Sequence, residues 1–139
     1  MIILDTNVLS EVVKPAPAPE VLAWLAAQEP LSVFTTAITR AEILYGIERT
    51  PDGTRKAGLA TAVELIFAQE FQARILPFDE QTGPWFATIC ATRECEGHVS
   101  SQMDGMIAAI ARQHRATLAT RNVADFPNCG IKLVNPWER

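Results

Sequence analysis

The sequence predicts an α/β protein of three layers, in which helices cover both faces of a central parallel sheet of four to five short strands. Short apolar runs with the features of strands alternate along the chain with longer stretches whose apolar residues recur at helical spacing. The first run, Ile2–Leu4, is apolar at every position, which is typical of a parallel strand buried on both faces. This alternation of strands and helices is the pattern of an α/β sandwich.

Length and composition narrow the possibilities further. A chain of 139 residues has the size of one domain, so we expect a single domain over residues 1–139. The apolar stretches are far shorter than a membrane span, and no basic segment of a signal peptide opens the chain, so we expect a cytoplasmic protein. Three cysteines without paired spacing indicate neither a disulfide framework nor a zinc site. The net charge of −4 argues against a broad basic surface for duplex nucleic acid, but it does not exclude a nuclease with a metal-neutralised acidic site.

The five predicted strands are short and are followed by polar or turn-forming residues. They are expected at residues 2–4, 31–36, 74–79, 117–120 and 131–134. Six helical segments lie between them. They are expected at residues 8–13, 19–29, 39–47, 56–72, 85–97 and 102–114.

Local signals justify the helix boundaries. Pro19 suits the first turn of the second helix. The third helix opens at Thr39 and Glu42, which have the spacing of a capping box. The turn Pro51–Gly53 separates it from a long fourth helix. The polar loop His98–Ser101 precedes the sixth helix, which is the most apolar of the chain.

Four acidic residues stand near the ends of predicted strands or at the start of a helix, where ligands of open α/β sheets bind. Asp5 follows the first strand, Glu42 the second and Asp125 the fourth, while Asp104 lies in the first turn of the sixth helix. Helix capping explains each acid singly, and it is the simpler explanation for Glu42 and Asp125. For Asp5 capping and function weigh equally. Asp79, after the third strand, is interpreted as a cap.

Asp104 is harder to explain by capping alone. Ile107, Ala108 and Ala111 lie at i+3, i+4 and i+7 from it, so its carboxylate shares the buried face of the helix. An unpaired carboxylate on such a face is expensive, and the nearest basic residues on this helix are about two turns away. A metal ion is therefore the simplest partner for Asp104.

Carboxylates that converge at one sheet edge repel one another unless divalent cations or shared protons neutralise them. Because this set offers only oxygen ligands, it favours Mg²⁺ or Mn²⁺, which serve phosphate chemistry. Thr6, Asn7, Thr120 and Asn122 could hold the carboxylates or a phosphate, although capping and turn formation explain them equally well. If Thr6 or Asn7 caps the first helix, Asp5 is left to face the ion.

Four motifs occur in the order that PIN-domain ribonucleases have, and the chain resembles that family. The motifs are Ile3–Asn7, Thr39–Glu42, Asp104–Ala109 and Ala119–Phe126. The resemblance is greatest to VapC and FitB-like toxins of bacterial type II toxin–antitoxin pairs. The segment Arg74–Asp79 and the closing Asn135–Trp137 are also similar to that branch.

The resemblance implies a PIN-like fold and Mg²⁺- or Mn²⁺-dependent cleavage of RNA. It also implies a homodimer and a small antitoxin whose tail reaches the acidic pocket. Asp5, Glu42 and Asp104 match acidic positions of the family directly. Some members carry the fourth acid where this chain has Asn122, and others carry it at the position of Asp125, so either position could complete the site.

The leading hypothesis is a metal-dependent RNA endonuclease. Asp5 and Asp104 would be the primary metal ligands, Glu42 would hold the metal or activate water, and Asp125 would complete the acidic ring. Two alternatives are a catalytically silent PIN-like module that acts through a partner protein and a phosphoacceptor domain that uses Asp5. The sequence names neither the RNA nor the antitoxin.

Overall fold

A five-stranded sheet lies at the centre of the computed structural model, which describes residues 1–97 and 101–138. Its strands are β1 (Ile2–Leu4), β2 (Val33–Thr36), β3 (Ile75–Leu76), β4 (Thr117–Ala119) and β5 (Lys132–Val134). They pair in the order β3-β2-β1-β4-β5, and every pair is parallel. The predicted parallel sheet is confirmed. Most of the predicted loop at residues 98–101 lies outside the described residues.

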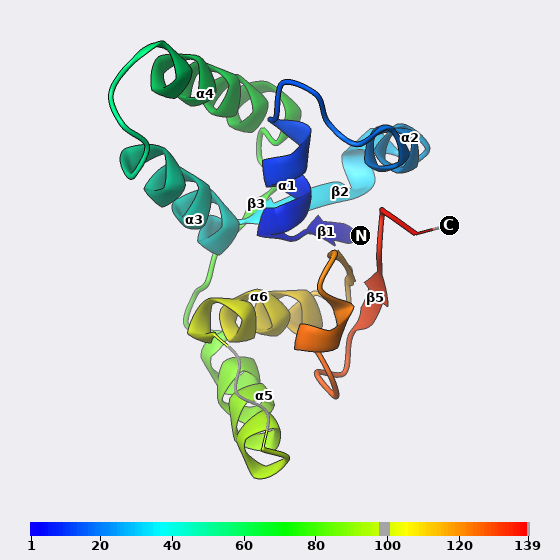
Figure 1. Cartoon of the computed structure of the whole chain (residues 1–139). Coiled ribbons are helices and arrows are strands. Elements are labelled where there is room, and N and C mark those ends of the chain that lie inside the picture. The colour runs from blue at the N-terminus through cyan, green and yellow to red at the C-terminus, as the bar shows by residue number, and fades with distance from the viewer. Residues whose placement is uncertain (98–100, 139) are drawn as a thin grey trace.

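Helices cover both faces of this sheet (Figure 1). The helices on one face are α1 (Thr6–Val12), α2 (Pro19–Ala26), α3 (Ala37–Glu48) and α4 (Thr54–Leu65). The helices on the other face are α5 (Gly83–Cys95) and α6 (Gln102–Gln113). The three-layer sandwich predicted from the sequence is therefore confirmed. None of the helices that the structure describes is long and apolar enough to cross a membrane.

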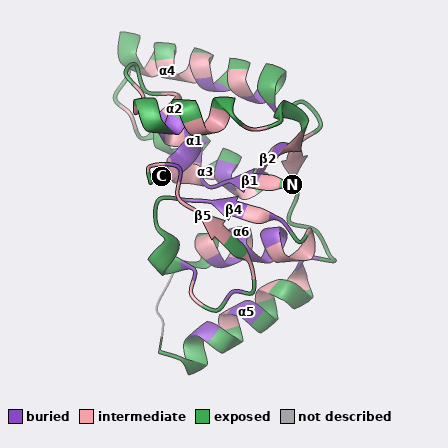
Figure 2. Ribbon diagram, turned by 90° about the vertical axis from the view of Figure 1, so that its right-hand side faces the viewer, coloured by how far each residue is buried: buried purple, intermediate pink, exposed green. Residues whose placement is uncertain are grey.

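Each face of the sheet carries its own hydrophobic core, so the central strands β1, β2 and β4 are mostly buried between them (Figure 2). In β1, Ile3 packs in the core under α5 and α6, whereas its neighbour Leu4 packs in the core under α1 to α4. Both side chains are fully buried. Since successive side chains of a strand point to opposite faces, a strand covered on both sides needs apolar residues at consecutive positions.

The start of α3 differs from the prediction. The helix begins at Ala37, because Thr36 caps it and its Oγ1 accepts a hydrogen bond from the N–H of Thr39 at 3.0 Å. Thr39 is therefore not the cap, and Glu42 lies in the second turn. The capping-box interpretation of Thr39 and Glu42 is wrong, since the cap comes from the last residue of β2.

The predicted long fourth helix also changes its geometry. The α-helix ends at Leu65 and continues as one π-helical turn, η2 (Ile66–Glu70). Val63, Phe67 and Phe71 are buried and follow one another at a spacing of four residues. An α-helix has 3.6 residues per turn, so such a series drifts around the helix. The wider π turn keeps these side chains closer to one face.

Candidate acidic active site

The four predicted acids come from elements that meet at one edge of the sheet. Asp5 follows β1, Glu42 lies in α3 after β2, and Asp104 lies in the first turn of α6. Asp125 lies in a 3₁₀ turn after β4, η3 (Val123–Asp125). In the sheet, β2 and β3 lie on one side of β1, and β4 and β5 lie on the other, so the strand order reverses at β1. Ligands of open α/β sheets bind at the carboxyl ends of the strands where the order reverses.

Asp5 is buried at the end of β1, with 3% of its surface exposed. Its Oδ1 accepts a hydrogen bond from the backbone N–H of Thr6 at 2.8 Å and caps α1. Its Oδ2 accepts hydrogen bonds from the Thr120 hydroxyl at 2.8 Å and from Asn7 Nδ2 at 3.3 Å. The expectation that Thr6 or Asn7 caps the helix is wrong, because the extended backbone of Asp5 places its own carboxylate over the first amide of α1.

Asn7 and Thr120 connect the ends of β1 and β4. Asn7 Nδ2 donates to the Thr120 hydroxyl oxygen at 3.2 Å, and Asn7 Oδ1 accepts from the N–H of Arg121 at 3.1 Å. The same hydroxyl oxygen accepts from the N–H of Asn122 at 3.1 Å, so its single proton is directed to Asp5. Within the described residues the Asn122 side chain forms no hydrogen bond, and only its backbone joins this network.

Thr6 connects the same edge to Glu42. Its Oγ1 donates to Glu42 Oε1 at 2.8 Å and lies 3.0 Å from Thr39 Oγ1. Since the only hydroxyl proton of Thr6 goes to Glu42, the Thr39 hydroxyl donates to Thr6. Apart from the family motif, the sequence indicates only a capping role for Thr39. Its position three residues before Glu42, on the same side of a helix, is the signal that could have assigned it to the site.

The charges of three acids interact at Asp5. Burial raises the pKa of the Asp5 carboxyl from its ordinary value of 3.8 to about 6. Hydrogen bonds from Thr120 and Thr6 oppose this rise, whereas the negative charges of Asp104 and Glu42 add to it. Carboxylates from α3 and α6 therefore act on the buried carboxylate of β1.

Asp104 is half-buried at the start of α6. Ser101 caps this helix, since its Oγ accepts a hydrogen bond from the N–H of Asp104 at 3.1 Å. Burial raises the pKa of the Asp104 carboxyl, and the neighbouring Ser101 side chain lowers it. The charge of Asp125 raises this pKa further, and the charge of Arg93 lowers it. Asp125, itself exposed, is thus the fourth acid that acts on the cluster.

Arg93 was not expected at this site. It lies in the last turn of α5 and is buried, although arginine is rarely buried without a partner. Phe86 and Ile89 precede it by seven and four residues, so it continues the apolar stripe of α5. An arginine on an apolar stripe is the sequence signal that could have found it.

A family model for the PIN domain matches residues 2–128. The chain belongs to the PIN-domain family. This PIN domain is 38% identical to VapC ribonuclease Y4jK of Sinorhizobium fredii, and the matched 138 residues cover 99% of both chains. It is 39% identical to toxin FitB of Neisseria gonorrhoeae over 137 residues and 99% of both chains. A chain in the crystal structure of FitAcB from Neisseria gonorrhoeae has 38% identity and a TM-score of 0.92, with 100% of each chain covered. The family resemblance of the motifs is therefore confirmed.

The donor chemistry of the PIN-domain cluster fits a hard divalent cation, because all four acids offer oxygen atoms. Within residues 1–97 and 101–138, however, no three acidic, histidine or cysteine side chains are grouped closely enough to enclose an ion. Mg²⁺ suits such an open arrangement, since it keeps several water ligands and binds proteins through one or two carboxylates.

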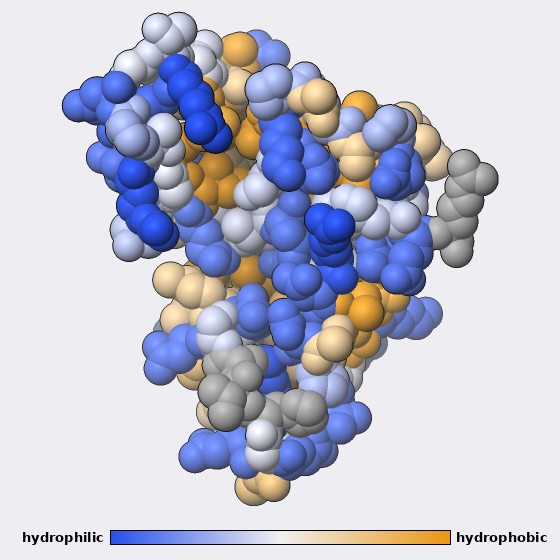
Figure 3. Space-filling model, viewed as in Figure 1, coloured by the Kyte–Doolittle hydropathy of each residue, from blue (hydrophilic) through white to orange (hydrophobic). Residues whose placement is uncertain are grey.

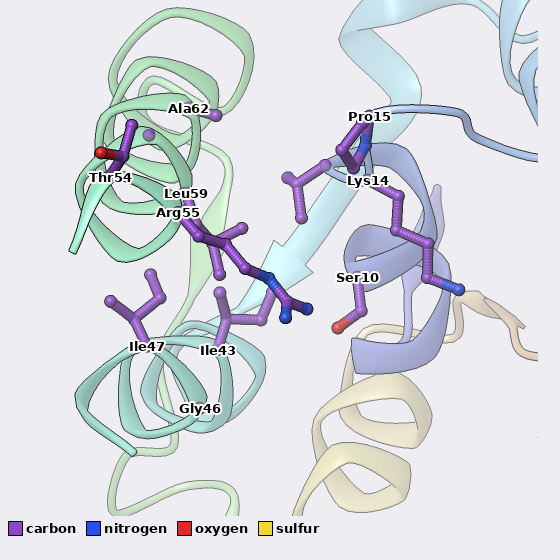
Figure 4. Close-up of a pocket in the computed structure, with 12 residues that line it drawn as sticks. Ser10, Lys14, Pro15, Ile43, Gly46, Ile47, Thr54, Arg55, Leu59 and Ala62 are labelled. Atoms are coloured by element: carbon purple, nitrogen blue, oxygen red, sulfur yellow. The ribbon is translucent and has the colours of Figure 1, made fainter. Parts of the chain in front are cut away.

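A separate apolar cavity of about 530 Å³ lies between α1, α3 and α4 of the PIN domain (Figure 4). Ile43, Ile47 and Leu59 are among the side chains of its wall, and Lys14 and Arg55 line it as well. Figure 3 shows hydrophobic surface in this region. None of the four acids lines the cavity. It offers apolar contacts next to the helix that carries Glu42, but no catalytic group.

Proposed function

We propose that this PIN domain is an endonuclease that hydrolyses phosphodiester bonds of RNA with the help of Mg²⁺ or Mn²⁺. Asp5 and Asp104 would be the primary ligands, Glu42 would hold the ion or activate water, and Asp125 would complete the acidic ring. The main observation behind the proposal is that the Asp5 carboxylate is buried and that the negative charges of Asp104 and Glu42 act on it. A helix cap alone would not need those neighbours.

A bound Mg²⁺ or Mn²⁺ supplies Lewis acidity toward phosphate oxygens and water. The chain's own residues orient the groups around it. Three hydrogen bonds fix the Asp5 carboxylate, two of them from Thr120 and Asn7. Glu42 Oε1 accepts a hydrogen bond from the Thr6 hydroxyl, and within the described residues Glu42 Oε2 accepts no hydrogen bond. That second oxygen can therefore accept a proton from an attacking water molecule.

Similarity to a VapC ribonuclease and to toxin FitB supports the further proposal that the protein is the toxin of a toxin–antitoxin pair. Its partners would be RNA, a small antitoxin whose tail reaches the acidic pocket, and a second copy of the chain in a homodimer. The cytoplasm is the compartment in which such a toxin meets RNA. Expression of the chain should arrest growth, and coexpression of its antitoxin should restore growth.

The central test is cleavage of single-stranded RNA by the purified protein with Mg²⁺ or Mn²⁺, and with EDTA in their place. Asp5→Asn and Asp104→Asn should each lower the cleavage rate roughly 100-fold or more, because each removes a ligand of the ion. Glu80→Gln is the matched control, since it neutralises an exposed acid outside the cluster. Cleavage that survives EDTA, or full activity of Asp104→Asn, would contradict the proposal.

A catalytically silent binding module is the alternative, and the open arrangement of the acids is the observation that favours it. Calorimetric titration with Mn²⁺ separates the two, because a silent module would bind no ion. The phosphoacceptor alternative is not favoured, since Asp5 is buried and both of its carboxylate oxygens already accept hydrogen bonds.

A further inference from the structure

Arg93 is the one buried lysine or arginine among the described residues, with 2% of its surface exposed. Its Nη2 donates a hydrogen bond to the backbone carbonyl oxygen of Asp125 at 2.6 Å. Its Nε and Nη1 are buried and have no hydrogen-bond partner within the described residues. The ion pairs of those residues do not include it. A buried guanidinium without a paired carboxylate is expensive, so its retention needs an explanation.

The surroundings of Arg93 supply a negative field. Its charge lowers the pKa of Asp104, whereas the charge of Asp125 raises it, so both charges act on the Asp104 carboxylate. Arg93 reaches this corner from α5, Asp104 from α6 and Asp125 from η3. A cation in the protein interior thus lies beside two acids of the proposed site.

The Asp125 turn is closed by two backbone hydrogen bonds and is followed by Phe126, whose side chain is buried in the core under α5 and α6. It is a 3₁₀ turn of three residues, and no side chain caps its start. Asp125 is exposed, and its carboxylate accepts no hydrogen bond from the described residues. Repulsion from Asp104 acts to move this carboxylate into solvent. The hydrogen bond from Arg93 joins the turn to α5, and the positive charge offsets that repulsion.

We propose that Arg93 is a positioning residue, which anchors the turn Val123–Asp125 to α5 and thereby keeps the Asp125 carboxylate beside Asp104 as the fourth acid of the site. The role in ion binding rests on the proposed function, whereas the anchoring of the turn does not.

The anchoring is tested in the metal-free full chain by amide hydrogen exchange. Arg93→Met keeps a long side chain but removes the charge and the donors. It should speed exchange of the Asp125 and Phe126 amides, which bond to Asn122 and Val123 within the turn, and leave the α6 amides unchanged. Arg93→Lys should give an intermediate result. Unchanged exchange at the turn in a folded Arg93→Met protein overturns the proposal.

The link to the acidic site is tested by the dissociation constant of Mn²⁺, measured by calorimetry. Arg93→Met and Asp125→Asn should each weaken binding roughly tenfold, as loss of a supporting contact does. The double variant should bind no more weakly than Asp125→Asn, because Arg93 acts through Asp125. If the double variant weakens Mn²⁺ binding by the product of the two single effects, Arg93 does not act through Asp125.

Arg74→Met is the matched control, since Arg74 also donates to a backbone carbonyl, that of Pro30 at 2.6 Å, but at the far side of the sheet. It should change neither the exchange of the turn nor the Mn²⁺ dissociation constant. If the unchanged protein binds no Mn²⁺ and cleaves no RNA, the proposed function fails, while hydrogen exchange still decides whether Arg93 anchors the turn.

Discussion

Asp5 combines two roles in one carboxylate. Its Oδ1 caps α1 by accepting a hydrogen bond from the N–H of Thr6, and its Oδ2 accepts hydrogen bonds from Thr120 and Asn7. The helix N-terminus favours the negative charge, whereas burial and the acids around it oppose that charge. The net result is a raised pKa, so the protonation of Asp5 depends on the charges of Asp104 and Glu42.

The raised pKa of Asp5 predicts the pH dependence of stability in the metal-free protein. The folded state holds this proton more tightly than the unfolded chain, because the pKa is about 6 against an ordinary 3.8. The free energy of unfolding should therefore fall as the pH rises from about 4 to about 6, by about 3 kcal/mol from this group. Above that range both states are ionised and the loss is complete. Urea denaturation at several pH values measures this fall.

Asp5→Asn should make the free energy of unfolding depend less on pH between about 4 and about 6. Asp79→Asn is the control, because the pKa of Asp79 is shifted in the opposite direction. Although desolvation acts to raise it, the pKa of Asp79 is lowered by hydrogen bonds from Thr82 and Gln81. Its stabilising contribution is therefore lost as the pH falls below about 4, so Asp79→Asn should reduce the loss of stability in that acid range and leave the fall between about pH 4 and about pH 6 unchanged. Equal pH dependence of the unchanged protein and Asp5→Asn would contradict the role given to burial.

Thr6→Val tests the hydroxyl that holds Glu42. The change keeps the shape of the side chain but removes the donor to Glu42 Oε1. RNA cleavage should fall about tenfold, because a supporting hydrogen bond to a site residue is lost while the residue remains. Thr61→Val is the matched control, since the Thr61 hydroxyl bonds only within exposed α4. A cleavage rate equal to that of the control would remove Thr6 from the site.

The position of Asp104 relative to Arg93 depends on how α5 and α6 pack against each other. Gly105 follows Asp104 in α6, and a Cβ added there would lie 2.9 Å from Cys90 Sγ and 3.3 Å from a ring carbon of Phe86. The absence of a side chain at Gly105 therefore lets α5 approach the start of α6. This close approach also brings Arg93 of α5 to the corner of Asp104.

Gly105→Ala should lower the free energy of unfolding by about 1–3 kcal/mol, because overpacking outweighs the better helix propensity of alanine. Scanning calorimetry measures the change. Cys90→Ala removes the contacting sulfur, so the double variant should recover part of the loss. Gly58→Ala is the control, since a Cβ at Gly58 in α4 meets nothing within 4 Å. Equal effects of the two glycine substitutions would contradict this packing argument.

At the scale of the whole molecule, the acids of four segments contribute to one unfavourable cluster in a chain of net charge −4. An ion that binds only the folded cluster should stabilise the entire fold. At about 100 times its dissociation constant, Mg²⁺ should raise the free energy of unfolding by about 2.7 kcal/mol, and EDTA should reverse the gain. Asp104→Asn should lose most of this response. A melting temperature that does not respond to Mg²⁺ would contradict the metal site.

The layered parallel fold and the four segments that carry the acids could be predicted from the sequence alone. Those features depend on local information, such as the apolar run of Ile2–Leu4 and the position of an acid just after a strand. Parallel strands bring their carboxyl ends to one edge, so Asp5 and Glu42 were expected together. The cap of α6 at Ser101 was likewise local, because its partner Asp104 is three residues away.

The partner of each acid could not be predicted from the sequence, because it depends on the three-dimensional fold. The hydrogen bond between Thr120 and Asp5 joins positions 115 residues apart, and that between Arg93 and Asp125 joins positions 32 apart. No periodic pattern specifies such pairs, because they depend on how strands and helices are placed in space. Burial is also a property of the whole fold, so the raised pKa of Asp5 and the enclosed charge of Arg93 arise only when both cores have formed.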